Sequence, residues 1–174
     1  MEFKFEITEE DYLQFNLYHS ENSPSQKKLV RVLRWVIPIV FASIIYYVGT
    51  AVFHQPSLYW LIISLLFSGA WIIWYPRFYK KQLKKQVSKM LSEGDNSALF
   101  GEKTMVIEGN EIKVFDKYAS TTVVKENIKA INYYDDMIII YLSSITAQII
   151  PTRNLVKDEQ KQLITYLDQL VEKG

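Results

Sequence analysis

The amino-acid sequence predicts an α+β membrane protein, in which a two-helix transmembrane hairpin is joined to an antiparallel sheet of about seven strands capped by a C-terminal helix. Three observations predict this class. Residues 35–76 contain no Asp, Glu, Lys or Arg. Basic residues without any acid flank this window on both sides, at 27–34 and 77–89. From residue 104 onward, short β-branched and aromatic runs alternate with turn residues, which is typical of strands.

The chain begins with a predicted strand and a predicted helix. Residues 3–7 read Phe-Lys-Phe-Glu-Ile, a strict alternation that predicts a short strand. Thr8 follows as an N-cap, with acidic residues in the first helical turn after it. Residues 20–25 form a polar break that contains Pro24. We expect residues 1–26 to join the cytoplasmic domain.

The charge-free window predicts two membrane spans, at about 35–53 and 58–75. The polar residues 54–57 split it into two apolar runs. At a rise of about 1.5 Å per residue, each run spans roughly 27 to 29 Å, close to the hydrocarbon thickness of a bilayer. A soluble domain of this size has no way to bury two helices that are apolar all round. Pro38 is expected in the first turn of the first run, and Pro76 is expected to end the second.

Aromatic and basic residues predict the depth and orientation of the hairpin. Amphipathic rings prefer the membrane–water interface, where we expect Trp35, Tyr59, Trp60, Trp74 and Tyr75. Lys and Arg next to membrane spans stay in the cytoplasm, and the connecting loop has none. The predicted location is therefore the cell membrane, with two spans and both termini in the cytoplasm. The first apolar run follows an acidic leader, so we expect no secretory signal and both spans to remain in the mature protein.

A basic juxtamembrane helix and a strand-rich domain follow the spans. Residues 77–91 have helical spacing and complete a basic-flanked hairpin segment at 27–92. The remaining domain, 93–174, closes with a helix predicted at 154–173, whose apolar positions are Leu163, Ile164, Leu167, Leu170 and Val171. Six strands are predicted before that helix, at 104–108, 111–115, 120–124, 130–134, 137–142 and 146–150.

The layout and one C-terminal motif resemble the YcxB-like family of small bacterial membrane proteins. The resemblance is carried by the charge-rich segment from Phe5 to Tyr12, two closely spaced membrane helices, and the ending Ile-Ile-Pro-Thr-Arg-Asn-Leu at 149–155. Thr152 stands where family members usually carry a second basic residue. The resemblance implies a pleckstrin-like soluble domain, which is a strongly bent seven-stranded sheet closed by a helix. It implies no biochemical activity and no catalytic residues.

Residues that usually carry catalysis or bind metals are few and scattered. The chain has no cysteine, which excludes disulfides, thiolate metal sites and cysteine nucleophiles. Its two histidines, His19 and His54, lie on opposite sides of the first apolar run. The acidic pair at 135–136 and the serine pair at 143–144 fit solvated turns better than a metal site or a nucleophile. We therefore predict no enzymatic activity, no cofactor and no metal site.

The basic segment after the spans is the candidate site for anionic lipid headgroups. Each of its positive charges attracts such a surface by about 1 kcal/mol. A topology signal alone is the simpler explanation of the segment, and an acidic protein partner is a further alternative. Nucleic acid is not an expected partner, because an acidic domain follows the segment and would repel a polyanion. The candidate lipid-contacting residues are Arg77, Lys80, Lys81, Lys84, Lys85 and Lys89.

Small residues in the spans and tyrosines in the domain form two weaker candidate sets. Close helix packing is predicted at Gly49, Ser64, Ser68 and Gly69, either within the hairpin or at an oligomer face, so the oligomeric state stays open. Lysines of the domain are mixed with acids, which argues against a phosphoinositide-type pocket. Exposed tyrosines or a free sheet edge would serve a protein partner, although cross-strand packing is the simpler role of the tyrosines at 133, 134 and 141.

The predicted function is that of a membrane-anchored, non-enzymatic interaction module, a scaffold or regulator that presents its domain at the cytoplasmic membrane surface. The alternative is a small membrane effector of the immunity or envelope-stress type, which acts through the hairpin by pairing with another membrane protein. Mutations in the sheet should abolish the function of a scaffold. Mutations at Gly49, Ser64 or Ser68 should abolish the function of a hairpin effector.

Overall fold

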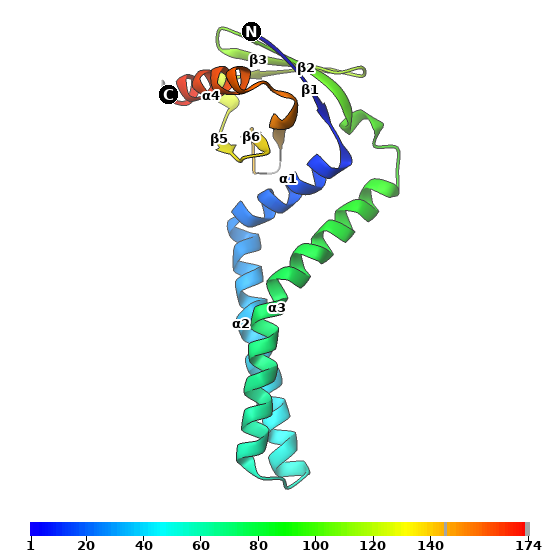
Figure 1. Cartoon of the computed structure of the whole chain (residues 1–174), viewed down its shortest axis with the longest axis vertical. Coiled ribbons are helices and arrows are strands. Elements are labelled where there is room, and N and C mark those ends of the chain that lie inside the picture. The colour runs from blue at the N-terminus through cyan, green and yellow to red at the C-terminus, as the bar shows by residue number, and fades with distance from the viewer. Residues whose placement is uncertain (145, 173–174) are drawn as a thin grey trace. The chain divides into compact units, whose positions relative to one another are not determined.

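The computed structural model describes residues 1–144 and 146–172 and divides into two compact units. The sheet unit contains Met1–Phe15 and the chain from Met90 onward, and the hairpin unit is Asn16–Lys89. Helix α1, Glu9–Asn22, begins in the sheet unit and ends in the hairpin unit (Figure 1). The predicted α+β class, with two long apolar helices and antiparallel strands, is confirmed.

The sheet unit contains seven strands among the described residues, but they form two sheets instead of the single sheet expected. The first sheet has the order β1-β2-β3-β4 and the second the order β5-β6-β7, and every pairing is antiparallel. Short 3₁₀ turns lie at Ser97–Leu99, Lys125–Asn127 and Thr152–Asn154, and the second of these separates the sheets. The strands are β1 Glu2–Ile7, β2 Gly101–Glu108, β3 Glu111–Phe115, β4 Ser120–Val124, β5 Ala130–Tyr133, β6 Met137–Tyr141 and β7 Ala147–Pro151.

The first strand explains why β2 begins earlier than expected. Ile7 pairs with Gly101 and Glu6 with Glu102, so β2 extends beyond the apolar run that starts at 104. Alternate residues of β1 point inward, which leaves the side chains of Phe3, Phe5 and Ile7 buried. The N-terminal strand therefore completes the first sheet.

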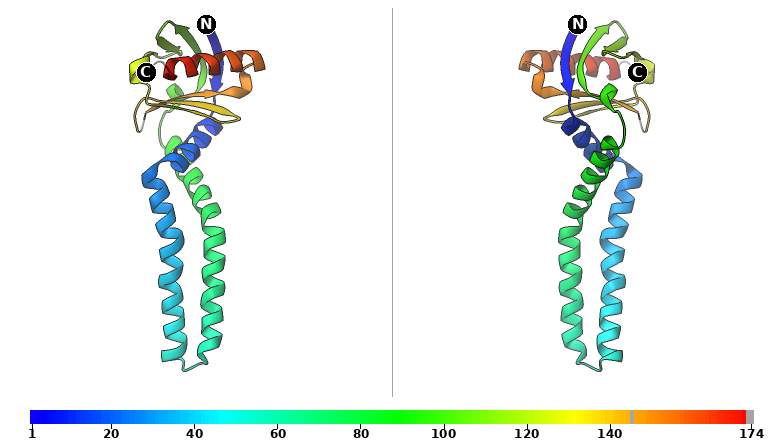
Figure 2. Two further views of the ribbon diagram at one scale, coloured as in Figure 1. Left: turned by 90° about the vertical axis from the view of Figure 1, so that its left-hand side faces the viewer. Right: turned by 90° about the vertical axis from the view of Figure 1, so that its right-hand side faces the viewer.

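The core of the sheet unit lies between the two sheets and helix α4, Lys157–Glu172 (Figure 2). Every residue of β6 is buried, because this central strand is covered on both faces. Helix α4 contributes the buried side chains of Leu163, Leu167 and Leu170, as its apolar spacing predicts. The side chain of Val171 and residue 173 lie outside the described part of the chain.

The predicted N-cap at Thr8 is confirmed, and the C-terminal motif contacts it. The Thr8 backbone N–H donates to Asp11 Oδ2 at 2.7 Å, and the Thr8 hydroxyl accepts from the Asp11 backbone N–H at 3.4 Å. The Arg153 guanidinium forms an ion pair with Asp11 and donates to the Glu6 carbonyl at 2.9 Å. Burial opposes ionisation of Asp11, yet the hydrogen bonds from Arg153 and Thr8 hold the pKa of this carboxyl below its ordinary value.

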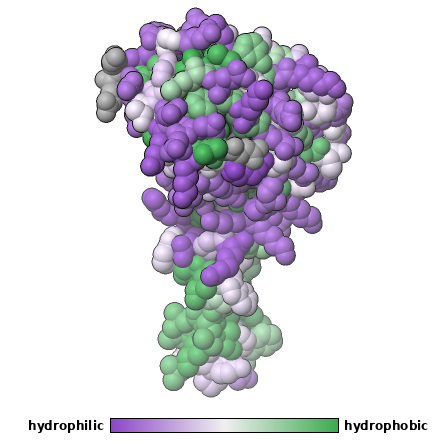
Figure 3. Space-filling model, turned by 45° about the horizontal axis from the view of Figure 1, so that its top comes forward, coloured by the Kyte–Doolittle hydropathy of each residue, from purple (hydrophilic) through white to green (hydrophobic). Residues whose placement is uncertain are grey.

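The hairpin unit is built from α2, Pro24–Tyr47, and α3, Ser57–Ser92, and a π-helical turn at Val48–Val52 extends α2. Both helices are long and apolar enough to cross a membrane, by length and composition. Apolar side chains cover the loop end of the hairpin on the face shown in Figure 3. The expected apolar runs thus lie inside longer helices.

Two expectations about the ends of these helices are wrong. Helix α2 begins at Pro24, with Ser23 as its N-cap, so the polar break at 20–25 is much shorter than expected and Pro38 lies in the helix interior. Helix α3 continues through Pro76 to Ser92 instead of ending there. Both helices continue beyond the charge-free window into the flanking basic segments, because lysine, arginine and glutamine are good helix formers.

Candidate functional site

The six predicted lipid-contacting residues all lie on α3 after Pro76, and five of them are exposed. The Lys80 ammonium lies 2.5 Å from Glu21 Oε1 of α1. Lys84 is half-buried. Of the set, Lys80 is the residue that lines a pocket in the hairpin unit.

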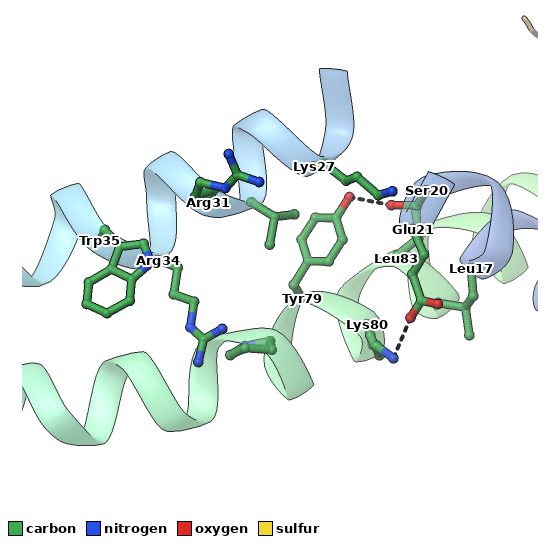
Figure 4. Close-up of a pocket in the computed structure, with 12 residues that line it drawn as sticks. Leu17, Ser20, Glu21, Lys27, Arg31, Arg34, Trp35, Tyr79, Lys80 and Leu83 are labelled. Carbon is green, nitrogen blue, oxygen red and sulfur yellow. Dashed lines mark hydrogen bonds and ion pairs between the residues drawn. The ribbon is translucent and has the colours of Figure 1, made fainter. Parts of the chain in front are cut away.

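This pocket, which we call the basic pocket, has a volume of about 350 Å³ and lies between the end of α1, the start of α2 and the middle of α3 (Figure 4). Its cations are Lys27, Arg31 and Arg34 from α2 and Lys80 from α3. From the sequence, the three α2 cations are expected only to orient the hairpin in the membrane. Their i, i+4, i+7 spacing is the signal that could have found them, since it places them on one face of the helix.

Hydrogen bonds at the back of the pocket tie its three helices together. The Tyr79 hydroxyl of α3 lies 2.9 Å from the Ser20 hydroxyl of α1 and donates to Gln26 Oε1 of α2 at 3.1 Å. Because a phenol has one proton, Ser20 is the donor in the first of these bonds. Ser20 itself is buried. Figure 4 shows the Tyr79 ring pointing from α3 into the space between the other two helices.

Arg34 explains how α3 passes through Pro76 without a break. Proline has no N–H, so the carbonyl four residues earlier, at Ile72, loses its usual helical donor. Arg34 Nε donates to the Ile72 carbonyl at 3.0 Å and replaces that donor. The guanidinium of Arg34 is thereby fixed across the pocket, from α2 to α3, as Figure 4 shows.

Lys27 and Arg31 carry the positive charge of the pocket that the protein does not neutralise. Both side chains are exposed, and neither has a hydrogen-bond or ion-pair partner among the residues that the structure describes. The carboxylate in the lining, Glu21, pairs with Lys80. The basic pocket therefore keeps an excess of positive charge, which suits an anion with several acceptor oxygens.

The basic pocket lies where the charge-free window ends on both helices. On α2 the last cation, Arg34, is followed by Trp35, and on α3 Pro76 is followed by Arg77. Trp35 and Pro76 both line the pocket. Leu17, Val30 and Leu83 add further apolar surface to its lining. Cationic and apolar walls thus meet in one pocket.

Three of the four predicted packing residues lie in contacts within the hairpin. Ser64 Oγ lies 3.2 Å from the Ala42 carbonyl and Ser68 Oγ 3.4 Å from the Pro38 carbonyl, both across from α3 to α2. Each hydroxyl also lies 2.8 Å from a carbonyl one turn earlier in α3, to which it donates its single proton. At Gly49 an added Cβ would lie 2.0 Å from the Trp60 ring. At Gly69, in contrast, an added Cβ would meet nothing within 4 Å. Gly69 is therefore not at a close helix contact in this chain.

The five predicted interface aromatics divide into two groups. Trp35, Tyr59 and Trp74 are exposed, as the interface hypothesis requires. Tyr75 is buried and stacks on Trp71, with ring centroids 5.3 Å apart, and Trp60 packs against Gly49. Tyr75 and Trp60 therefore stabilise the hairpin. The sequence pattern alone does not distinguish this role from anchoring at the membrane interface.

Two side-chain contacts of the sheet unit join a lysine or a tyrosine to a carboxylate. The Lys103 ammonium lies 2.8 Å from Asp116 Oδ2, and this hydrogen bond lowers the pKa of Asp116 to about 2. Tyr133 donates to Asp168 Oδ1 of α4 at 2.6 Å, and burial together with this carboxylate raises its pKa. Within the described ranges, no three His, Asp or Glu side chains come together as metal ligands.

Searches for related proteins do not identify a family for the chain. The scan against family models and the searches of curated proteins and of solved structures find no match.

Proposed function

We propose that the chain is a membrane-anchored, non-enzymatic interaction module of the cell membrane, a scaffold or regulator. Segments 35–53 and 58–75 cross the bilayer, and both termini face the cytoplasm. The sheet unit is a pleckstrin-like domain that binds a protein partner at the membrane surface, while the basic ends of the hairpin contact anionic headgroups. We also place the chain in the YcxB-like family.

The observation that carries the proposal is the contrast between composition and burial in the hairpin unit. Only 11% and 6% of the most apolar stretches of the two long helices are buried inside the protein. A core helix of a soluble protein would be mostly buried, so these helices have the surface of bilayer-spanning segments. Leu66 and Trp74, for example, are 69% and 71% exposed. Cations begin immediately outside this surface on both helices.

The sheet unit supports the pleckstrin-like part of the proposal. It combines a four-stranded and a three-stranded antiparallel sheet with a C-terminal helix over their core. The family assignment is supported by the contact between Arg153 of the C-terminal motif and Asp11 of the N-terminal segment, because the two segments that carry the resemblance meet there. A hairpin effector is less favoured, since Gly49, Ser64 and Ser68 are used in contacts within the hairpin.

The absence of cysteine makes the membrane topology directly testable. Gln55→Cys lies in the loop between the two helices and Glu126→Cys on an exposed part of the sheet unit. In intact cells, a membrane-impermeant thiol reagent should label Gln55→Cys at once and Glu126→Cys only after permeabilisation. Labelling of both variants in intact cells, or of neither, would contradict the proposed topology.

Crosslinking in the membrane of the native host tests the interaction part. A scaffold should crosslink to one membrane or cytoplasmic protein, and that product should be lost when Tyr133 or Lys125 of the sheet unit is changed. Gly69→Ala in the hairpin should leave the product unchanged and serves as the control. Loss of the product in hairpin variants alone would instead support the effector hypothesis.

A further inference from the structure

We infer that the basic pocket binds the phosphate group of an anionic phospholipid, with Lys27 and Arg31 as the principal contacts. This inference rests on the proposed membrane insertion of the hairpin, because insertion brings the pocket to the level of the headgroups. It replaces a diffuse attraction between a basic segment and the membrane by one defined lipid site. Three of its four cations come from α2, and the basic segment of α3 contributes Lys80.

Charge selects an anion for this site. Glu21 neutralises Lys80, and the Nε of Arg34 is engaged by the Ile72 carbonyl. Lys27 and Arg31 have no partner in the described part of the chain, and both line the pocket from one face of α2. A guanidinium offers a planar fork of donors to phosphate oxygens, and an ammonium adds a compact point charge. Such charge-assisted hydrogen bonds are about twice as strong as neutral ones.

Size and apolar lining select a lipid over a free phosphate ion. A volume of about 350 Å³ far exceeds the needs of a lone phosphate and falls in the range of small-molecule sites. On α2 the apolar lining consists of Val30, which lies between the cations, and Trp35, which directly follows Arg34. Beyond it, α2 exposes Val36 and Ile39 along the charge-free window, where an acyl chain can lie. A phospholipid matches both parts, and basic pockets between transmembrane helices are known lipid sites.

The walls of the pocket are held in place before any ligand binds. Tyr79 ties α3 to Ser20 and Gln26, and Arg34 ties α2 to α3. A preformed site loses little conformational entropy on binding, which raises affinity. A flexible basic segment on a membrane surface has no such arrangement, and this difference provides the test.

The test compares two double variants that remove the same charge. Lys27→Gln with Arg31→Gln removes the two principal contacts. Lys28→Gln with Lys129→Gln removes two exposed cations that do not line the pocket and are not among the six candidate lipid contacts of α3. Lys28 is the sequence neighbour of Lys27. All four side chains are exposed, so both variants should fold like the wild type, which thermal unfolding verifies.

Binding is measured on the full chain in a zwitterionic detergent, titrated with short-chain phosphatidylglycerol and followed by native mass spectrometry. We expect one tightly bound lipid per chain, and weaker retention of short-chain phosphatidylcholine, whose headgroup has no net charge. The pocket variant should bind phosphatidylglycerol about tenfold more weakly or worse, since each lost charged hydrogen bond costs about that factor. The control variant should change the affinity by less than about twofold, because its cations contact no bound phosphate.

Three results would overturn the inference. Equal weakening in both variants would mean a diffuse basic surface, and displacement of the lipid by excess inorganic phosphate would mean a free-phosphate site. No tight phosphatidylglycerol binding by a chain whose topology labelling shows insertion would refute the site while leaving the proposed function intact. The thiol labelling of Gln55→Cys is independent of the pocket, so its failure would refute the proposed function separately.

Discussion

The two units of the chain differ in whether selected charged side chains are paired within the protein. In the sheet unit, partly buried ion pairs match Lys103 with Asp116 and Arg153 with Asp11. In the hairpin unit, Lys27 and Arg31 face one pocket without a partner in the described chain. These charged groups of the sheet unit are paired within the protein, whereas two pocket cations of the hairpin unit have no partner in the described chain.

Apolar side chains show the same contrast. Leu163 and Ile139 of the sheet unit are 0% exposed, whereas Leu66 of the hairpin unit is 69% exposed. A unit that buries its own apolar surface is stable in water. A unit that exposes such surface next to unpaired cations fits a surrounding that supplies hydrocarbon and anions together. The proposed bilayer with anionic lipids would supply both.

Matched leucine truncations should give the largest difference. Leu163→Ala removes a side chain from the core of the sheet unit and should lower its free energy of unfolding by about 2–5 kcal/mol. Leu66→Ala, at a position where little protein surrounds the side chain, should cost much less. Urea unfolding of the full chain in detergent, followed by circular dichroism, measures both. Similar losses for the two variants would show that the hairpin unit buries its apolar side chains after all.

Two glycine variants probe whether the hairpin has one tight helix contact or two. Gly49→Ala places a methyl group onto the Trp60 ring and should destabilise the hairpin by about 1–3 kcal/mol. Gly69→Ala meets open space and should be neutral or stabilising, because alanine is the better helix former by about 1 kcal/mol. Titration with sodium dodecyl sulfate measures the helix lost by each variant. A comparable loss at Gly69 would reveal a helix contact outside the single chain.

Local periodicity was sufficient to predict the elements of the fold but not their assembly. Alternation along 3–7 predicted β1, and the apolar face of 154–173 predicted α4. Division of the strands into two sheets depends on which strand pairs with which, a non-local property that spacing does not encode. The continuation of α3 through Pro76 depends on Arg34, which is distant in sequence and replaces the lost donor.

The candidate site was predicted only in part for the same reason. Charge density predicted the basic segment of α3, and Lys80 belongs to both that set and the basic pocket. The pocket itself requires α1, α2 and α3 to meet, and Tyr79 joins them through hydrogen bonds to residues more than fifty positions away. A one-dimensional pattern of charge cannot show which cations face each other.

Acid should weaken the sheet unit through Asp116. Its hydrogen bond from Lys103, with those from the backbone of 118 and 119, lowers its pKa to about 2 from an ordinary value of 3.8. A lowered pKa in the folded state means stabilisation that is complete above pH 3.8 and is lost as the pH falls towards 2. Asp116→Asn should be less stable at neutral pH, and its stability should fall less between pH 4 and 2. Urea unfolding at a series of pH values measures this. An identical acid dependence in wild type and variant would contradict the role of this ion pair.

Removal of one hydroxyl should give the smallest effect and test whether the sheet unit matches even its accessible polar groups. Tyr133→Phe removes the hydrogen bond to Asp168 that joins β5 to α4. It should lower the free energy of unfolding by about 1 kcal/mol or less, because solvent exposure weakens this bond to a carboxylate. Tyr118→Phe is the control, since its exposed hydroxyl has no hydrogen-bond partner in the described chain. The same urea titration should leave this control unchanged. Equal effects at 118 and 133 would mean that the hydrogen bond between β5 and α4 contributes nothing to the free energy of unfolding. Stabilising polar contacts in the sheet unit would then be confined to its ion pairs.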